Sequence, residues 1–277
     1  MAILNMEAPT CIITAINACD YIGLFNERRV VYYCVDDFSE WPGLEKKRIQ
    51  SMEGELLKKA DIIVATSDEL YRRLSSTGKE IHLLTHGVDY EFFKKKVDQE
   101  HPLLKEIPKP RVGYFGLFDK RSDQELIAAV AERMPNFSFI ITGNVEVDTA
   151  GLRAKKNIYF TGGIPYRELP AMASGWDICI LPYKINKLTD SIQPLKLKEY
   201  LSTGIPVVST PIKESVKLGM YLSIAKTPQE WEEKIKENIK GTSVKQKNQI
   251  QSFLEKESWN SKAELFFNIC LKGSMIK

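Results

Sequence analysis

The sequence predicts an α/β protein with two domains built on doubly wound parallel sheets. Short apolar, β-branched runs alternate with amphipathic helical segments along nearly the whole chain, the pattern of a parallel sheet covered by helices on both faces. The 277 residues suffice for two domains. A charged, proline-containing segment, Lys94–Lys109, interrupts the alternation and is predicted to be the linker.

The apolar runs predict the strands of both domains. Before the linker they are Val30–Val35, Ile62–Ala65 and Ile81–Leu84. After it they are Arg111–Phe115, Phe137–Thr142, Ile158–Thr161, Ile178–Pro182, Val207–Thr210 and Tyr221–Ile224. The roughly 90 residues before the linker fall short of the ~100–150 residues of a typical domain. We therefore expect either a small first domain or one whose beginning is absent.

Helical periodicity fills the intervals between these strands. In Leu44–Ala60, a spacing of three and four places one apolar stripe on the helix: Ile49, Met52, Leu56, Leu57 and Ala60. Two capping boxes predict helix starts, Thr66 with Glu69 and Ser122 with Glu125. The corresponding helices are Ser67–Ser75 and one running from Ser122 toward Met134, and later ones are predicted at Gln229–Lys240, Val244–Lys256 and Asn260–Leu271.

Composition excludes several classes of protein. Hydrophobic residues make up 43% and charged residues 27%, which argues against disorder and against a collagen-like or coiled-coil chain. The net charge of +3 is too small to indicate a nucleic-acid partner. No stretch approaches the ~18 apolar residues of a membrane span, and the N-terminus lacks the pattern of a secretory signal. We therefore expect a cytoplasmic location. The five cysteines form no C-x-x-C pair, so neither a disulfide framework nor a zinc knuckle is predicted.

The loop after the first strand of the second domain is one candidate ligand site. Gly116 would let a ligand approach the backbone, and Lys120 or Arg121 would reach a phosphate. Doubly wound sheets bind ligands beyond the carboxyl ends of their strands, where this loop lies. The alternative is a simple turn followed by a solvated helix start.

A second candidate is the helix predicted to begin at Pro194 and to end at the cap Gly204. Lys196 and Glu199 are three residues apart and share a face of its first turns. A cation and a carboxylate there suit a ligand with a phosphate and a vicinal diol, because the carboxylate accepts two hydroxyl hydrogen bonds. A surface salt bridge between the two side chains is the competing interpretation.

The segment Pro194–Thr210 resembles the donor-site signature of the retaining glycosyltransferases of family 4, P-L-K-x-x-E-Y-L-x-x-G-x-P-V-V-S-T. Four other segments agree with that family. Thr161–Pro170 is similar to its nucleobase loop, Gly113–Gly116 to its opening strand and His86–Asp89 to its H/N-G-V-D motif. Tyr33–Phe38 resembles a segment of bacterial wall-polysaccharide transferases.

The resemblance implies the GT-B fold, with two Rossmann-like domains. The first domain, at 1–93, is partial and faces the acceptor, and the linker covers 94–109. The second, at 110–256, binds the nucleotide sugar, and 257–277 is a closing helix that returns to the first. Glu257–Trp259 resembles the start of that helix.

The same resemblance implies roles for individual residues. Glu199 would hold the ribose hydroxyls, Lys196 with Lys120 or Arg121 the diphosphate, and His86 would lie near the hinge as a catalytic candidate. Gly116 would admit the ligand, and Ile164 to Tyr166 would surround the base. Ser191 occupies the donor-site position where the family often has the first glutamate of an E-x7-E pair, so the usual carboxylate facing the sugar is absent.

The resemblance predicts a retaining transferase that moves a sugar from a nucleotide diphosphate donor to a glycan or lipid-linked acceptor in surface-polysaccharide assembly. It implies neither a cofactor nor a metal ion. Consistently, Asp36 and Asp37 lack the D-x-D spacing of a metal-binding pair, and His82, His86 and His101 are scattered. Asp36 and Asp37 are instead candidates for acceptor contacts or for capping the loop that follows them.

Four further possibilities stay open. One alternative to a transferase is a non-catalytic nucleotide-sugar-binding subunit whose partner supplies the acceptor half. Another is a GT-B sugar epimerase. Lipid-linked acceptors would favour a peripheral contact with an anionic membrane surface. An unfinished first domain would expose sheet edge and apolar surface, which predicts a homodimer or a complementing partner.

Overall fold

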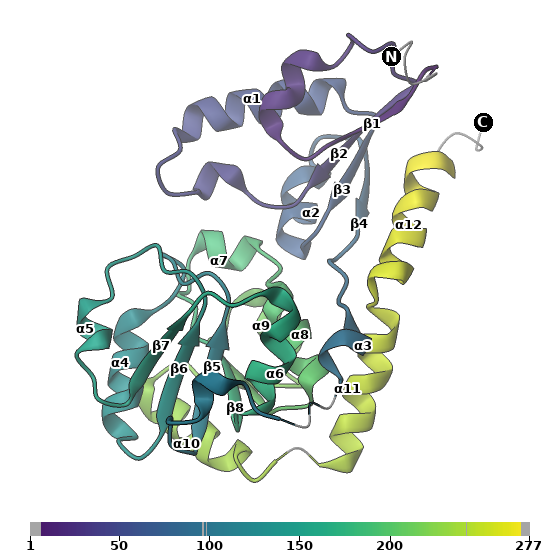
Figure 1. The fold of residues 1–277 in the computed structure, drawn as a ribbon. Helices are drawn as coiled ribbons and strands as arrows, with labels where there is room; N and C mark the ends of the chain where they lie inside the picture. The colour runs from purple at the N-terminus through teal and green to yellow at the C-terminus, as the bar shows by residue number, and fades with distance from the viewer. Residues whose placement is uncertain (1–6, 96, 98, 242, 273–277) are drawn as a thin grey trace. The chain divides into compact units, whose positions relative to one another are not determined.

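The computed structural model describes residues 7–95, 97, 99–241 and 243–272. Contacts divide the chain into two compact units, each with a parallel sheet of its own (Figure 1). The first unit comprises residues 1–87, 190–193 and 259–277, and the second comprises residues 88–189 and 194–258. The segment predicted as a linker, Lys94–Lys109, is therefore grouped with the second unit, and the division falls after Gly87.

The first sheet contains four parallel strands in sequential order: β1 (Thr10–Ile13), β2 (Arg29–Cys34), β3 (Ile62–Ala65) and β4 (Glu80–Leu83). Right-handed crossovers between strands in this order place every connecting helix on the same face. That face carries η2 (Ile16–Tyr21), α1 (Lys46–Lys59) and α2 (Asp68–Ser75), whose apolar residues pack with Tyr32 and Ile63. The stripe predicted on Leu44–Ala60 is confirmed: Leu56 and Ala60 are buried, and the others pack against the same core.

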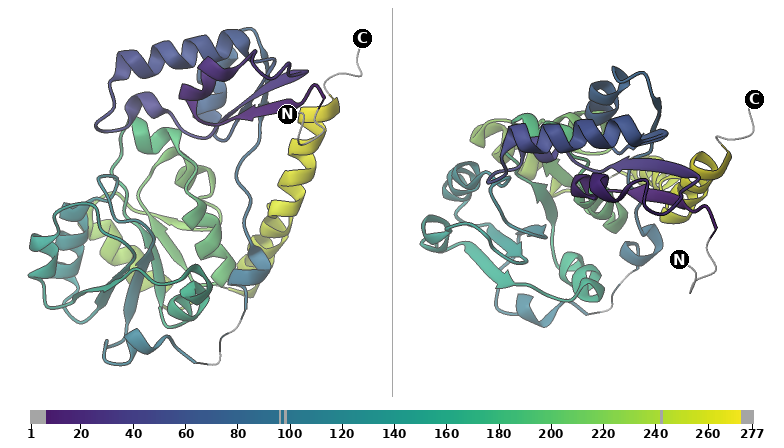
Figure 2. Two further views of the ribbon diagram at one scale, coloured as in Figure 1. Left: turned by 45° about the horizontal axis from the view of Figure 1, so that its top comes forward. Right: turned by 90° about the horizontal axis from the view of Figure 1, so that it is seen from above.

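The opposite face of the first sheet is covered by a segment from the far end of the sequence. Helix α12 (Trp259–Lys272) packs Phe266 and Cys270 against Val31 and Val64 of that face. Arg29 Nη1 donates to the backbone oxygen of Cys270 at 2.8 Å. Figure 1 shows α1 and α12 (yellow) on different sides of the first sheet, and Figure 2 repeats the view from two further directions.

The second sheet has six parallel strands in the order β10-β9-β8-β5-β6-β7. In chain order they are β5 (Arg111–Phe115), β6 (Ser138–Thr142), β7 (Ile158–Gly162), β8 (Ile178–Leu181), β9 (Val207–Ser209) and β10 (Ser223–Ile224). The chain fills the β5 to β7 side first and then returns to place β8 beside β5. The strand order thus reverses between β5 and β8, the point at which doubly wound sheets bind ligands.

Helices cover both faces of the second sheet. On one side α10 (Pro228–Asn238) packs against α4 (Gln124–Arg133), and on the other α8 (Leu195–Thr203) packs against α3 (Tyr90–Phe93), α6 (Leu169–Ser174) and α11 (Val244–Lys256). The remaining short helices are α5 (Ala150–Arg153), α7 (Lys187–Ser191), α9 (Lys213–Lys217), η3 (Phe38–Glu40), η4 (Pro102–Leu104) and η5 (Tyr166–Glu168). Together these layers confirm the predicted α/β class and the parallel sheets.

Both predicted capping boxes are wrong by one residue. The N-cap of α2 is Ser67, whose side chain accepts from Leu70 N, while Thr66 Oγ1 donates to the carbonyl oxygen of Val35. The N-cap of α4 is Asp123, which accepts from Leu126 N. In each case two neighbouring residues are able to cap a helix, and the pattern that included Glu at the third position selected the wrong one.

Gly113 lies in the middle of β5 because no side chain fits there. A Cβ atom at this position would stand 1.9 Å from Cδ2 of Trp176, which is buried. We expect Gly113→Ala to lower the free energy of unfolding by about 1–3 kcal/mol, the usual cost of overpacking a core. Urea denaturation measures it. Gly151→Ala is the matched control, because none of the residues that the structure describes has an atom within 4 Å of its Cβ position. An equal loss in both variants would contradict the packing argument.

Candidate functional site

The backbone turns sharply where β5 ends. Gly116 has φ +117°, a conformation that glycine adopts readily and other residues rarely do. Its N–H donates to the carbonyl oxygen of Thr142 at 2.8 Å. A Cβ atom on Gly116 would lie 2.1 Å from Cε of Lys196 and 2.8 Å from its Nζ. The amine of Lys196 therefore lies directly over the bare backbone of this loop.

A second glycine, Gly143, has the same function at the end of β6. Its φ is +138°, and a Cβ atom there would lie 2.1 Å from the carbonyl oxygen of Gly116. The two loops thus pack backbone against backbone. Sequence reasoning missed Gly143, although a glycine directly after a buried strand is the signal that identified Gly116.

These loops line a cavity of about 240 Å³ at the carboxyl edge of the sheet. Three residues predicted from the sequence are among its lining: Gly116, Ile164 and Tyr166. The sequence analysis did not single out six others: Leu117, Thr142, Gly143, Asn144, Gly163 and Leu169. Pockets for whole ligands usually measure about 300–1,000 Å³, so this cavity fits one ring system of a larger ligand.

Helix α8 carries the two charged candidates beside this cavity. The sequence predicted Pro194 at the first helical position, but Pro194 is the N-cap and the helix begins at Leu195. Gly204 caps the C-terminus with φ +74°, as predicted. Leu197, Tyr200 and Leu201 are buried, which leaves the stripe with Lys196 and Glu199 half-buried. Both residues lie in the first turns of the helix, where unpaired N–H groups and the macrodipole favour an anion.

The amine of Lys196 is held by two aromatic residues. Its Nζ donates to the hydroxyl oxygen of Tyr183 at 3.3 Å. The same Nζ lies 5.7 Å from the ring centroid of Tyr114 and 5.9 Å from that of Tyr183, and both rings are buried. Tyr183 therefore orients the lysine, a role that packing considerations alone did not predict.

Glu199 accepts a hydrogen bond from the hydroxyl of Tyr166, with 3.2 Å between Oη and Oε1. Burial raises the pKa of Glu199 above its ordinary value, and the hydrogen bond from Tyr166 and the charge of Lys196 offset part of the rise. Across the residues that the structure describes, no ion pair joins Lys196 to Glu199. The competing interpretation of a surface salt bridge is therefore wrong.

The two basic residues after Gly116 differ in their surroundings. Arg121 is paired with Asp119, with 2.7 Å between Nη2 and Oδ2. Burial alone would lower the pKa of Arg121, but the hydrogen bonds and charge of Asp119 raise it above its ordinary value. Lys120 is exposed. Of the two, Lys120 is the better candidate for a ligand phosphate, since the charge of Arg121 is balanced locally.

Two predicted residues, His86 and Ser191, are grouped with the first unit and not with the others. The ring of His86 lies 6.2 Å from that of Trp259, and its backbone N–H donates to the side-chain oxygen of Gln193. The carbonyl oxygen of Ser191 accepts from Ser67 Oγ at 2.5 Å. The structure therefore assembles Gly116, Lys120, Arg121, Ile164, Tyr166, Lys196 and Glu199 in one unit and places the remaining two in the other.

Asp37 has the capping role that was one of its two interpretations. Its Oδ1 accepts from the backbone N–H of Ser39 at 3.1 Å and from Ser39 Oγ at 2.7 Å. Within the described residues, no group of three or more His, Cys, Asp or Glu side chains is arranged to hold a metal ion. Among the same residues, no helix has both the length and the hydropathy to span a membrane.

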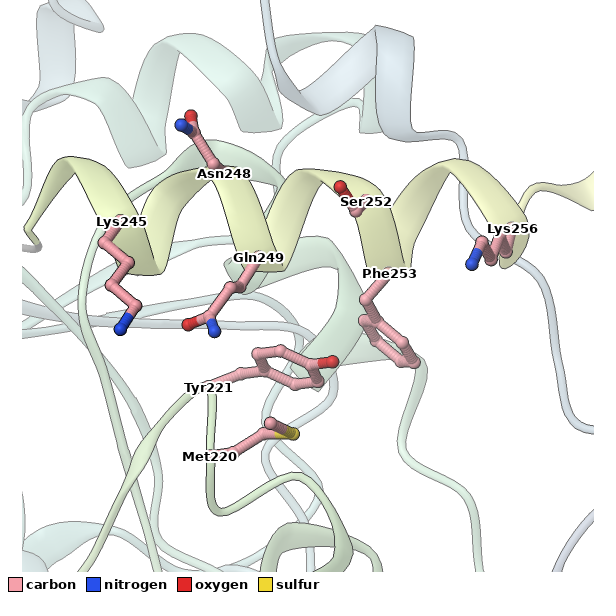
Figure 3. A pocket seen from close by; sticks show the side chains of 8 residues that line it. All are labelled: Met220, Tyr221, Lys245, Asn248, Gln249, Ser252, Phe253 and Lys256. Atoms are coloured by element: carbon pink, nitrogen blue, oxygen red, sulfur yellow. The ribbon is translucent and has the colours of Figure 1, made fainter.

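A second hollow, of about 540 Å³, lies along α11 in the second unit (Figure 3). Tyr221 and Phe253 stack beneath the helix with their ring centroids 4.8 Å apart, and Gln249 points toward Tyr221. Tyr221 comes before β10 rather than after a strand, so this hollow lies at the amino edge of the parallel sheet. It is therefore separate from the cavity beside Gly116.

Comparison with known proteins identifies the segment that carries the cavity. Residues 109–240 match the family model described as Glycosyl transferases group 1. This segment is similar to the group 1 glycosyltransferases. Gly116, Lys196, Glu199 and every residue lining the cavity fall inside the matched segment.

The chain also resembles a curated protein. The chain is 27% identical over 212 residues to the protein assigned as the teichuronic acid biosynthesis glycosyltransferase TuaH of Bacillus subtilis (strain 168). The aligned residues are 70% of this chain and 53% of TuaH, so the chain spans about half the length of the curated relative that it matches.

Solved glycosyltransferase structures share the fold. A sucrose-phosphate synthase from Thermosynechococcus elongatus superposes with a TM-score of 0.76 at 17% identity, covering 94% of this chain and 72% of that one. HepE of Anabaena in complex with UDP superposes with a TM-score of 0.71 at 14% identity, covering 94% and 78%. The GT-B fold expected from the sequence is confirmed.

Proposed function

We propose that this chain is a retaining glycosyltransferase that moves a sugar from a nucleotide diphosphate to a glycan or lipid-linked acceptor. The observation that carries the proposal is the arrangement of Lys196 and Glu199 on the first turns of α8, beside the cavity at the strand reversal point. A cation over a bare glycine backbone and a carboxylate on the same helix match the diphosphate and the ribose of such a donor.

Each site residue has a defined part in this proposal. Glu199 accepts hydrogen bonds from the ribose hydroxyls, and Lys196 binds the diphosphate with the N-terminus of α8 and Lys120. Gly116 and Gly143 keep the backbone open to the phosphates, and Ile164 lines the cavity for the base with Tyr166. HepE has been crystallised in complex with UDP and in complex with UDP-glucose, which makes uracil the first base to test.

The proposed reaction retains the configuration of the sugar. The acceptor hydroxyl attacks the anomeric carbon from the face that the leaving diphosphate occupies. The bond from the anomeric carbon to the acceptor oxygen forms, the bond to the diphosphate oxygen breaks, and the proton passes to an oxygen of the released diphosphate. Lys196 and the N–H groups at the start of α8 stabilise the negative charge that develops on the diphosphate.

A non-catalytic nucleotide-sugar-binding subunit is the second candidate function. One observation favours it: the position eight residues before Glu199 holds Ser191, which has no carboxylate to face a sugar. In this alternative the donor binds, but a partner supplies the acceptor half. Transfer assays with the purified chain alone and with a polysaccharide acceptor separate the two functions, because only the enzyme releases nucleoside diphosphate at a rate that depends on the acceptor.

Calorimetric titration with UDP, GDP, dTDP and their common sugar conjugates tests donor binding. We expect one base to bind selectively and Lys196→Ala to weaken that binding by tenfold or more, since a charge-assisted contact to phosphate is worth about 1.5 kcal/mol or more. Repeating the titration with EDTA tests the expectation that no divalent ion is needed.

The matched control for Lys196→Ala is Lys234→Ala. Lys234 is a lysine of the same unit that lies on α10 and pairs with Glu237 at 2.8 Å. Its loss removes the same charge without touching the cavity. Binding that falls equally in both variants would indicate a general charge effect and would remove Lys196 from the site. If no nucleotide binds to the unmodified chain, the proposed function is wrong.

A further inference from the structure

The carboxylate that is proposed to hold the ribose already has a hydroxyl bound to it. Tyr166 Oη donates to Glu199 Oε1 at 3.2 Å, although the two residues are far apart in sequence and come from η5 and α8. Tyr166 is 53% exposed, whereas Glu199 is half-buried. The contact is therefore made by a side chain at the surface and not by one of the core.

Helix α3 holds the ring of Tyr166 in this position. Phe92 stacks on it with 5.2 Å between ring centroids and 5° between planes, and Phe93 meets it edge-on at 5.7 Å. Phe93 in turn stacks on Phe115, the last residue of β5, and is buried. The two phenylalanines thus fix the position of the Tyr166 hydroxyl. Through Phe115 they are themselves anchored to β5, the strand that leads to Gly116.

A phenol hydroxyl and a ribose hydroxyl make the same bond to a carboxylate, because each donates one proton to one of its oxygens. We propose that Tyr166 is a built-in occupant of the ribose position, so that a nucleotide reaches Glu199 only by exchanging its own hydroxyls for that of the tyrosine. This inference rests on the proposed function. It makes Tyr166 a residue that sets donor affinity, beyond its place in the wall of the base cavity.

The exchange has a measurable consequence for affinity. Breaking the bond from Tyr166 opposes binding, so removing the hydroxyl while keeping the ring tightens binding of a nucleotide that reaches Glu199. We expect Tyr166→Phe to bind UDP about fivefold more tightly, which corresponds to about 1 kcal/mol for one net hydrogen bond. A nucleotide without ribose hydroxyls leaves Tyr166 in place, so its affinity stays the same in both proteins.

Acidity provides a second readout that a purely structural tyrosine would not change. Glu199 must be ionised to accept the ribose hydroxyls, and the groups that face it are Tyr166 and Lys196, while the charge of Asp89 acts on Tyr166. The hydrogen bond from Tyr166 lowers the pKa of Glu199, so its removal lets that pKa rise. The pH at which UDP affinity falls on acidification should therefore be higher for Tyr166→Phe than for the unmodified chain.

The experiment is calorimetry of UDP and of 2′,3′-dideoxy-UDP with the unmodified chain, Tyr166→Phe and the control Tyr159→Phe. If the titration panel selects guanine, the two guanosine counterparts replace them. Tyr159 lies on β7 of the same unit and is half-buried, so its variant reports any general effect of losing a phenol hydroxyl. Tighter binding of UDP by Tyr166→Phe alone, with 2′,3′-dideoxy-UDP unchanged, supports the inference.

Three outcomes overturn it. Unchanged or weaker UDP binding by Tyr166→Phe shows that the tyrosine does not compete, and it leaves the proposed donor site intact. Equal tightening for 2′,3′-dideoxy-UDP shows that the effect does not pass through the ribose hydroxyls. A lack of nucleotide binding by the unmodified chain overturns the proposed function together with this inference.

Discussion

Glu199→Ala should weaken donor binding severely, with the affinity for nucleoside diphosphate falling about 100-fold. The variant loses an acceptor for two hydroxyl hydrogen bonds, and each bond to a charged group is worth about 1.5–3 kcal/mol. Burial already disfavours the ionised carboxylate of Glu199. Removing this side chain should therefore not lower the free energy of unfolding appreciably. Calorimetric titration together with urea denaturation measures both quantities.

Glu199→Gln is the matched control, because the amide keeps the size and one acceptor oxygen but does not ionise. Donor affinity in the unmodified chain should be complete above the raised pKa of Glu199 and should be lost as the pH falls through it. In Glu199→Gln that dependence should vanish. A steep acid limb that persists in the amide variant would assign the titrating group to another residue.

Gly143→Ala should have the largest effect on the cavity itself. Its Cβ atom would meet the carbonyl oxygen of Gly116 at 2.1 Å, and a backbone oxygen has no rotamer that moves it away. The two loops would have to separate, which takes the bare backbone of Gly116 away from Lys196. We expect a loss of about 2–4 kcal/mol in the free energy of unfolding, from backbone strain and overpacking together, and no measurable nucleotide binding.

Gly162→Ala separates the steric clash expected in Gly143→Ala from the backbone strain of an alanine with positive φ. Gly162 ends β7 with φ +76°, but no atom of the described residues lies within 4 Å of its Cβ position. Its substitution should therefore cost only about 1 kcal/mol, the penalty of a left-handed backbone. Denaturation curves for the two variants give the comparison. If Gly143→Ala is no less stable than Gly162→Ala, the close packing of the two loops is not what requires glycine at residue 143.

The sequence was sufficient for most of the second unit, because four of its strands, β5, β6, β8 and β9, are fully buried and form largely apolar runs in the sequence. Every predicted strand is present within two residues of its expected bounds. The first strand, Thr10–Ile13, was missed, because its four residues sit at the start of a longer uncharged stretch without clear alternation. Residues Thr10–Ile13 form a strand because they pair with β2, and such a long-range pairing produces no local pattern in the sequence.

The candidate site was predictable where one segment carries its own signals. Pro194 and Gly204 bound a helix whose buried stripe leaves Lys196 and Glu199 together, and both facts follow from spacing. The hydrogen-bond partners of Lys196 and Glu199 could not be predicted from this spacing. Tyr183 and Tyr166 reach them from other loops, and only the packing of β8 and α3 brings the hydroxyls within hydrogen-bond distance.

The second face of the first sheet has a consequence for how the chain is made. Its apolar residues, Val31 and Val64 among them, are covered by α12, which is translated long after the strands have left the ribosome. At about 5–20 residues per second, the interval from Gly87 to Trp259 lasts roughly 10–30 s. During synthesis one apolar face of the first sheet stays exposed to solvent until α12 has been translated. Nascent chains should therefore bind chaperones that recognise apolar surfaces.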